Sequence, residues 1–416
     1  MVDFDVVVVG GGIAGLNTVR LFHKKNPGKN VVLLESSNRV GGRLKTFKGV
    51  KDGREITLEL GGGRFSKCSH KRIMELFAEF GIETRDIPHS LENRYIFRRE
   101  DNSLEMENSL KGLLEELLRK RKEPPSRNIS LEEYATDVIG ESKAKQLKGL
   151  FGYISKFEAM SAYDAIKAIE RDYFSDRARY VIVPSGVEDL PKAMLERLVK
   201  NENFKISKRS KVQKIKMLRD GWRVEFDKDK RRTSITCSNL VLALTKNQMQ
   251  EIAQNSNIQF KYLDQIETIP MVRSYVGGLN SIDDRVNQIV IESGDLPQNM
   301  KRTRYKGVWM APYADSRNAI EFNRLSVPNR KKKVMEIFGK LPTWVLSKFW
   351  ESAVHVWKPG SNSSKAQSYF IEPYPRLHIC GEAVSTVQGW VEGALETSST
   401  ISDHIVEEQY RKKYKK

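Results

Sequence analysis

Residues 6–15 read Val-Val-Val-Val-Gly-Gly-Gly-Ile-Ala-Gly, and this stretch decides the fold. The unbroken run of β-branched residues predicts a strand over 6–9 that is buried on both faces, as the strands of a parallel sheet are. Helical character over 16–25 and a second apolar run over 31–34 complete a strand–helix–strand unit. Glycines at the first turn of such a unit predict a binding site for a dinucleotide.

The glycines follow the spacing Gly10-x-Gly12-x-x-Gly15, and each has its own steric purpose. Gly10 permits the tight turn, Gly12 lets the backbone approach a pyrophosphate, and Gly15 allows the helix to pack closely on the strand. The N-terminus of the helix offers free N–H groups to the phosphates. Glu35 lies twenty residues after the last glycine, where its carboxylate can accept hydrogen bonds from ribose hydroxyls.

A second glycine turn follows Glu35 directly, with the sequence Arg39-Val-Gly41-Gly42-Arg43. Its two arginines suit a phosphate because the planar guanidinium group donates two parallel hydrogen bonds. An NAD site does not need a second turn that faces an anion, so this stretch favours FAD as the cofactor.

The pattern Glu-x-x-x-Arg-x-Gly-Gly-Arg after a glycine-rich strand–helix turn resembles the flavin-containing amine oxidase superfamily, which includes monoamine, polyamine and L-amino acid oxidases. Four further stretches resemble family motifs in the expected order: the loop beneath the flavin ring, the strand that holds the adenine, the strand that closes this half, and the C-terminal flavin motif. They lie at 59–65, 211–215, 239–244, and 379–383 with 389–394. The resemblance implies FAD and adds these cofactor-binding residues: Gly61, Gly62, Val212, Gly381, Glu382, Gly389 and Trp390. We expect the FAD to be noncovalent, because Cys380, the cysteine near a flavin motif, is expected to lie in the core.

The fold implied is α/β, with a Rossmann-like FAD-binding domain interrupted by a substrate domain of a mixed sheet and helices. We expect the FAD-binding domain at 1–70, 178–250 and 375–410. The substrate domain then covers 71–177 and 251–374, and 411–416 form a basic tail. A helical insertion is expected over 109–167, where Ser130 and Glu133 have the form of a capping box. Short strands are predicted at 181–183, 204–206, 212–217, 222–226, 234–236, 240–244 and 377–380, short alternating strands and helices over 255–375, and helices at 73–80, 190–200 and 389–408.

Arg64 and Trp390 bear on the substrate. By resemblance, Arg64 in Leu-Gly-Gly-Gly-Arg-Phe matches the arginine with which amino acid oxidases hold the substrate carboxylate, and Gly389-Trp390 is typical of the same group. A buried guanidinium needs an anionic partner, so the alternative is a salt bridge to a protein acid such as Glu59. Where the family commonly has a lysine that holds a water near the flavin N5 atom, this chain has Arg273. The charge is kept, but arginine does not release its proton, which implies slower oxygen chemistry or another electron acceptor.

These residues predict an enzyme that oxidises a C–N bond, with an L-amino acid as the expected substrate and Arg64, Arg273 and Trp390 in the catalytic site. Hydride passes to the flavin, the imine hydrolyses, and oxygen takes the electrons to give hydrogen peroxide. One alternative is a monoamine or polyamine oxidase, which calls for an acidic or aromatic pocket and no role for Arg64. Another is an FAD-bound scaffold without catalysis, whose basic surface binds a partner.

Composition sets the remaining limits. The 416 residues carry 71 Lys and Arg against 53 Asp and Glu, a net charge of +18, which allows contact with nucleic acid or an anionic membrane as well as simple solubilisation. No signal peptide and no long apolar run is evident, so an intracellular and cytoplasmic protein is expected. Three distant cysteines and six histidines without ligand spacing argue against a disulfide scaffold and a metal site. Two alternatives remain for the aromatic residues Trp309, Tyr313 and Trp357: they line the substrate pocket, or they fill the hydrophobic core.

Overall fold

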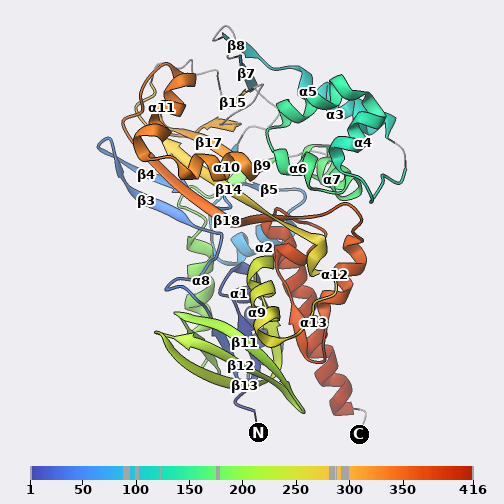
Figure 1. Cartoon of the computed structure of the whole chain (residues 1–416). Coiled ribbons are helices and arrows are strands. Elements are labelled where there is room, and N and C mark those ends of the chain that lie inside the picture. Colours follow the sequence, from blue (N-terminus) through green and yellow to red (C-terminus); the bar gives the residue numbers. More distant parts are fainter. Residues whose placement is uncertain are drawn as a thin grey trace.

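The computed structural model describes residues 2–87, 94–98, 103–121, 123–174, 179–280, 286, 288–291 and 299–414. Two large sheets lie at opposite ends of the molecule, with both chain termini at the end that holds the first sheet (Figure 1). Among the described residues, no helix is both long and apolar enough to cross a bilayer.

The first sheet contains the predicted glycine turn. Its strands, in spatial order, are β10 (Phe204–Ser207), β2 (Val31–Leu34), β1 (Phe4–Val9), β13 (Arg231–Leu242), β12 (Gly221–Lys228) and β11 (Ser210–Leu218), and β19 (Leu377–Ile379) also pairs with β13. β10, β2, β1, β13 and β19 run parallel, and β11 to β13 form an antiparallel meander. The predicted buried strand is confirmed, because alternate valines of β1 enter the cores on the two opposite faces of the sheet.

β13 corrects one prediction. We expected separate strands at 234–236 and 240–244, but a single strand continues through the first stretch and as far as Leu242 in the second. Its first half pairs with β12 and its second half with β1 and β19, and Cys237 is paired with both Phe4 and Trp222. Asn239 is buried there, with His378 3.5 Å from its side chain, so its polarity does not end the strand.

Helices cover both faces of this sheet. The parallel strands pack on one face against four helices, α1 (Ile13–Lys25), α2 (Lys71–Glu79), α8 (Asp189–Leu198) and α13 (Val391–Tyr414). On the other face they share a core with side chains of the antiparallel meander and with two helices, α9 (Lys246–Ser256) and α12 (Ser363–Ile371). Short helical turns η2 (Leu263–Gln265) and η3 (Glu382–Val384) join these layers. The predicted helices at 73–80, 190–200 and 389–408 correspond to α2, α8 and α13, and α13 continues into the expected basic tail as far as Tyr414. Lys415 and Lys416 lie outside the described residues.

The second sheet is mixed, as predicted. Its order is β18 (Val345–Trp357), β14 (Ile266–Val276), β17 (Trp309–Asp315), β16 (Asn299–Arg302), β15 (Gln288–Ile291), β7 (Arg94–Arg98) and β8 (Ser103–Met106). β15 and β7 pair in parallel, whereas the other pairs within this sheet are antiparallel. The expectation of short strands over 255–375 is wrong for β14 and β18, which have 11 and 13 residues and pair along their length, with one register shift.

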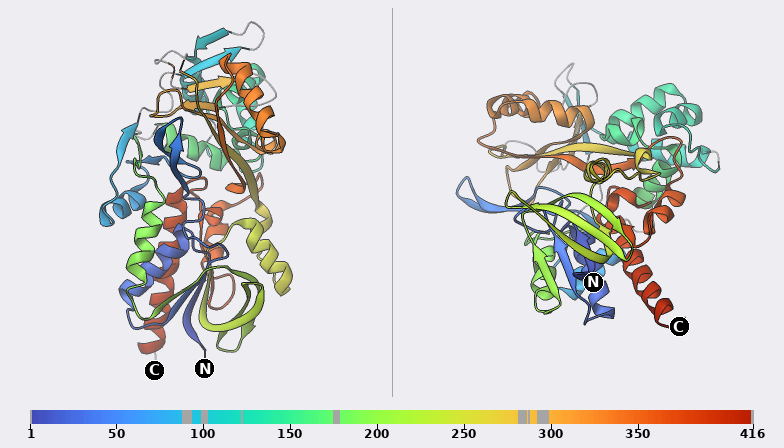
Figure 2. Two further views of the ribbon diagram at one scale, coloured as in Figure 1. Left: turned by 90° about the vertical axis from the view of Figure 1, so that its left-hand side faces the viewer. Right: turned by 60° about the horizontal axis from the view of Figure 1, so that its bottom comes forward.

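A layer of helices lies against this second sheet (Figure 2). It contains α3 (Ser109–Lys120), α4 (Leu131–Ile139), α5 (Glu141–Phe151), α6 (Ile154–Glu158), α7 (Ala162–Ile169) and the π-helical turn η1 (Glu170–Phe174). The capping box is present, because Ser130 and Glu133 bind each other's backbone N–H groups. α10 (Ser316–Arg324) and α11 (Val327–Phe338) pack elsewhere on the same sheet.

Two small sheets lie between the large ones. β3 (Thr46–Lys51) and β4 (Arg54–Glu59) form a hairpin, and β5 (Phe65–Ser66), β9 (Tyr180–Ile182) and β6 (Arg85–Ile87) form a three-stranded sheet. The segment between β4 and β5 is therefore held from both sides, and it contains Arg64. The α/β class is confirmed, and the first sheet draws its strands from separate parts of the chain. We keep the predicted domain boundaries as a proposal.

Candidate active site

A cavity of about 800 Å³ runs along the glycine turns of the first sheet. Its walls include every residue predicted to contact the cofactor except Gly15: Gly10, Gly12, Glu35, Arg39, Gly41, Gly42, Arg43, Gly61, Gly62, Val212, Gly381, Glu382, Gly389 and Trp390. A Cβ atom on Gly15 would lie 2.0 Å from the carbonyl oxygen of Gly10, so Gly15 has the close-packing position expected for the third glycine.

The two glycine turns are bound to each other. The N–H of Gly41 donates to the carbonyl of Gly11 at 2.8 Å, and Gly12 and Gly41 form a parallel bridge. A Cβ on Gly12 would meet no atom within 4 Å, so its backbone is open to a ligand. No side chain caps the N-terminus of α1. Unpaired N–H groups at an open helix start fit the pyrophosphate of FAD.

Glu35 and the arginines of the second turn have protein partners within this cavity. Glu35 accepts hydrogen bonds from the N–H groups of Gly11 (2.7 Å) and Ser37 (2.8 Å). Arg39 donates to carbonyls of its own turn, including Val40 at 2.9 Å, and therefore stiffens that turn. Arg43 binds the carboxylate of Glu382 at 2.7 Å. Both arginines line the cavity, and a guanidinium has five N–H donors, so their contact with a phosphate stays a prediction.

Glu382 is fully occupied by neighbouring groups. Its carboxylate accepts from the backbone N–H groups of His355 (3.0 Å) and Gly389 (2.7 Å), from His355 Nδ1 (2.8 Å), and from Arg43. These four bonds use the acceptor positions of a carboxylate. Burial would raise the pKa of Glu382, but His355 and Arg43 outweigh it and hold that pKa well below its usual value.

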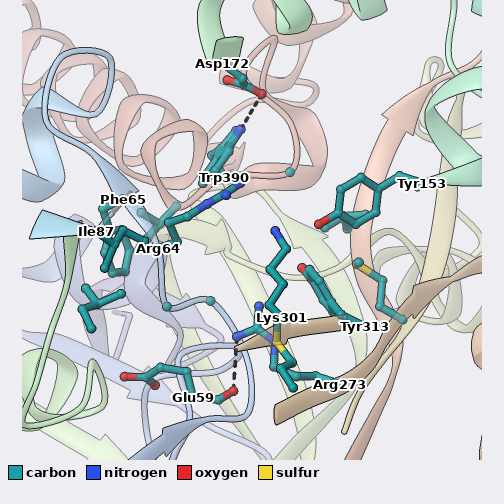
Figure 3. Close-up of a pocket in the computed structure, with 18 of the residues that line it drawn as sticks. Glu59, Arg64, Phe65, Ile87, Tyr153, Asp172, Arg273, Lys301, Tyr313 and Trp390 are labelled. Carbon is teal, nitrogen blue, oxygen red and sulfur yellow. Dashed lines mark hydrogen bonds between the residues drawn. The ribbon is translucent and has the colours of Figure 1, made fainter. Parts of the chain in front are cut away.

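A second cavity, of about 670 Å³, shares part of its lining with the first one. Figure 3 shows residues that line this second cavity. The two cavities share Gly62, Met271, Arg273, Tyr313, Val354, Gly389, Trp390 and Val391. The second sheet supplies Met271, Arg273, Tyr313 and Val354, and the turn before α13 supplies Gly389 and Trp390. A flavin ring that reaches from the first cavity would end at this junction, so the second cavity is the candidate substrate site.

Arg64 enters the second cavity beside two aromatic rings. Its guanidinium carbon lies 4.5 Å from the centre of the Tyr180 ring and 5.8 Å from that of Trp390. The alternative that Arg64 pairs with Glu59 is wrong, because the Glu59 carboxylate accepts from the Val187 N–H (2.8 Å) and the Thr46 hydroxyl (2.8 Å). Among the described residues, no carboxylate lies within ion-pair distance of Arg64.

Arg273 lies on β14 at the junction of the cavities. Its guanidinium donates to the main-chain carbonyls of Gly61 and Glu59, the latter at 3.2 Å, and lies 4.6 Å from the centre of the Tyr313 ring. Arg273 therefore braces the loop that contains Gly61 and Arg64.

Sequence reasoning missed Tyr153, Lys156, Asp172 and Tyr180 as wall residues of the second cavity or neighbours of Arg64. They come from the helical layer and β9, where no motif marks them, and only tertiary packing brings them to Arg64. Of the three aromatic residues with two alternatives, Tyr313 lines both cavities, whereas Trp309 and Trp357 are buried in the core. Cys380 is buried beside Thr18, and burial raises the pKa of its thiol to about 12.

The histidines have varied surroundings. His355 lines the second cavity and binds Glu382, whereas His70 packs against Trp390 with a ring-centre distance of 4.5 Å. Burial lowers the pKa of His70 to about 4, so it is neutral at pH 7. Within the described ranges, one group brings metal-ligand atoms within 4.8 Å of one another: Glu372, His404 and Glu408. His404 bonds directly to Glu372 there (2.8 Å). His89 lies outside the described residues.

Comparison with known proteins gives consistent matches. The family model of flavin containing amine oxidoreductases matches residues 13–276. An L-amino-acid oxidase of Siganus canaliculatus is 24% identical over 96% of this chain and 85% of its own length. The flavin-containing amine oxidase B of Homo sapiens is 44% identical, over 19% of this chain and 14% of its own. The structure of putrescine oxidase bound to putrescine has a TM-score of 0.75 at 17% identity, covering 97% of this chain and 99% of that one, and shares its fold.

We predict that Glu59 makes stability depend on pH. Burial raises the pKa of its carboxyl from 4.5 to about 7. As the pH rises, the Glu59 carboxyl loses its proton at a lower pH in the unfolded chain than in the folded protein. Ionisation therefore lowers the free energy of unfolding of the parent progressively between these two pH values. Glu59→Gln keeps both hydrogen-bonding partners but cannot ionise. Its free energy of unfolding, minus that of the parent, should rise by about 3 kcal/mol from pH 4.5 to pH 8. Urea unfolding at both pH values measures this; a difference that is constant with pH contradicts it.

We predict that Glu35→Ala weakens FAD binding, because the ribose hydroxyls lose a charged acceptor worth about 1.5–3 kcal/mol. Titration of the apoprotein with FAD measures the change in Kd. Glu35→Gln keeps an acceptor oxygen and should lose less. A melting curve of each apoprotein controls for the lost contact with Gly11. If Glu35→Ala binds FAD like the parent, the ribose does not lie at Glu35.

Proposed function

The chain belongs to the flavin-containing amine oxidoreductase family, and from this premise we propose that its substrate is an L-amino acid, whose carboxylate binds Arg64. The chain is an enzyme and FAD is the cofactor of its family. When bound, FAD accepts hydride from the carbon that bears the amine and passes the electron pair to oxygen, which gives hydrogen peroxide, while the imine product hydrolyses in water.

The observation that carries the proposal is the guanidinium of Arg64. It lies in the second cavity next to two aromatic rings and has no carboxylate partner among the described residues. A cation in such surroundings is stabilised by an anion that brings two acceptor oxygens. A carboxylate held in this way fixes the orientation of the substrate, so that its Cα–H bond can face the junction of the cavities.

The charges around Arg64 favour an anionic substrate over a diamine. The second cavity is lined by Arg64, Arg85, Lys156, Arg273, Lys301, Arg302 and Arg304 against Glu59, Asp86, Asp172 and Asp315. Each of these acids already has a protein partner, as Asp86 has in Lys67 and Asp315 in Ser155. A substrate with two ammonium groups would meet the permanent charges of Arg64 and Arg273, while each of these four acids is already bound to the protein. The aromatic wall residues Tyr153, Tyr313 and Trp390 would also suit the monoamine or polyamine alternative, but each acid among the described wall residues is already bound to the protein.

Trp390 and Arg273 complete the proposed catalytic site. The indole of Trp390 borders both cavities and would shield the substrate amine from water. Loss of hydration favours the neutral amine, which is the form that releases hydride. Arg273 places a permanent positive charge at the junction without a proton to release. Contact of the basic surface with nucleic acid or an anionic membrane stays a prediction of the sequence.

Arg64→Ala tests the proposal. Breaking the charge pair should cost about 2–5 kcal/mol of transition-state stabilisation, measured as a fall in kcat/KM for an amino acid. The value of kcat/KM for the matching decarboxylated amine should fall much less, because the amine never used the contact. Arg64→Lys should already be impaired, since lysine lacks the planar fork. Anaerobic flavin reduction by each proteinogenic L-amino acid and by its amine is the measurement.

Arg197→Ala is the matched control for this test. Arg197 also lies over an aromatic ring, 3.9 Å from the centre of Phe80, but lines neither cavity, so its loss should leave the amino acid to amine ratio unchanged. A parent that prefers the amine, or an Arg64→Ala variant that weakens both substrates equally, would replace this proposal with the amine oxidase alternative.

Arg273→Met tests the role of the charge at the junction. We expect reoxidation by oxygen to slow more than reduction by substrate, because the positive charge acts on the oxygen half-reaction. Arg273→Lys keeps the charge and adds a releasable proton, so it should reoxidise at least as fast as the parent. Stopped-flow measurement of each half-reaction separates the two. Equal effects on both would exclude a special role for Arg273 in reoxidation.

A further inference from the structure

Asp172 lies in the wall of the candidate substrate site, in the π-helical turn η1 (Glu170–Phe174) that follows α7. It is buried, with 5% of its surface exposed, and Figure 3 shows its carboxylate turned toward Trp390. π-Helical turns are uncommon and recur at functional sites because they displace side chains from regular helical positions.

Asp172 binds two aromatic rings at once. Its carboxylate accepts a hydrogen bond from Trp390 Nε1 at 3.0 Å, and its main-chain carbonyl accepts one from the hydroxyl of Tyr180. The two rings are almost parallel, 20° apart with their centres separated by 6.2 Å. We refer to Tyr180 and Trp390 as the aromatic pair. Both of its rings lie within 6 Å of the guanidinium carbon of Arg64.

The carboxylate is held ionised by its neighbours. Arg171 Nε binds it at 2.7 Å, and Lys156 Nζ lies 4.0 Å away. Burial would raise the pKa of Asp172, but these two cations outweigh burial and keep that pKa below its usual value. An ionised acceptor binds the indole N–H more strongly than a neutral one would.

We propose that Asp172 is a positioning residue that holds the aromatic pair in place beside Arg64, and that it thereby sets the preference for an amino acid over the matching amine. The proposal rests on the proposed function, since Arg64 must bind the substrate carboxylate. Asp172 acts through Trp390 and Tyr180. If the indole of Trp390 rotated, Arg64 would lose its contact with that ring, and its guanidinium would no longer be held in the orientation that binds a carboxylate.

Asp172→Ala removes the carboxylate, and Asp172→Asn keeps an acceptor oxygen without the charge. We expect Asp172→Ala to lower kcat/KM for the preferred L-amino acid about tenfold, with a much smaller loss for its amine. Asp172→Asn should lie between Asp172→Ala and the parent, and it keeps the test valid if the alanine variant does not fold. Anaerobic flavin reduction of the FAD-bound protein measures both substrates.

Asp164→Asn is the matched control. Asp164 is also buried, on α7 just before η1, and its carboxylate accepts from the hydroxyls of Ser161 and Ser363, both at 2.6 Å. Removing the charge of Asp164 perturbs the same helical layer, but the Asp164 carboxylate binds these two serines and neither ring of the aromatic pair. It should lower the melting temperature and leave the amino acid to amine ratio as in the parent.

A double-mutant cycle with Trp390→Phe separates positioning from a general structural effect. Phenylalanine has no N–H, so Asp172→Ala should change the substrate ratio much less in that background than in the parent. The proposal is overturned if Asp172→Ala reduces both substrates equally, if Asp164→Asn changes the ratio as much, or if the effect of Asp172→Ala is the same with Phe at position 390.

Failure of the proposed function gives a different result. If Arg64→Ala does not change the amino acid to amine ratio, or if the parent reduces its flavin with amines alone, the carboxylate contact does not exist and the role of Asp172 falls with it. If Arg64→Ala abolishes the preference and Asp172→Ala leaves it intact, the proposed function stands and only the positioning role is wrong.

Discussion

The contact between the two glycine turns is the constraint on which the rest of the site depends. Gly41 binds the carbonyl of Gly11, and Gly61 lies so close to Arg43 that a Cβ on it would be 1.8 Å from the Arg43 carbonyl oxygen. Three backbone segments therefore meet without side chains between them. This arrangement shapes the first cavity and places the loop after β4, with Arg64 at its end, at the entrance to the second.

Charge is distributed differently in the two cavities. In the first, the charged side chains mostly satisfy one another, as Arg43 and Glu382 do, and the backbone of the glycine turns is left for a ligand. In the second, the acids that line it are paired with the protein, whereas Arg64 lies against Tyr180 and Trp390 and has no carboxylate partner in the described part of the chain. An unpaired guanidinium in a confined site is stabilised by an anion, which is the basis for proposing a substrate carboxylate there.

The aromatic residues link these cavities to the helical layer. Trp390 borders both cavities, packs on His70 and binds Asp172, so one indole in the turn before α13 contacts the residue that precedes α2 and a residue of η1. Arg273 performs a similar linking function from β14, since it binds the loop at Gly61 and lies over Tyr313. The geometry at the junction thus depends on the second sheet and the helical layer as much as on the nucleotide-binding sheet.

The sequence by itself determined the nucleotide half of this protein. Valines 6–9, the glycine spacing and Glu35 act over short distances along the chain, so their pattern predicts strand, turn and helix with the cofactor cavity between them. Arg64 and Trp390 were predicted from motifs, and Arg273 from its alignment with a lysine that is common in the family; all three line the second cavity.

Only the tertiary structure decided what surrounds those three residues. β13 continues past Asn239 because pairing on both sides outweighs the local polar signal. Tyr180 and Asp172 reach Arg64 from segments more than 100 residues away in the chain, without any local pattern. Their place follows from the pairing of β9 with β5 and β6 and from the packing of the helical layer on the second sheet. Contacts between such distant segments depend on how whole elements pack and leave no periodic trace in the sequence.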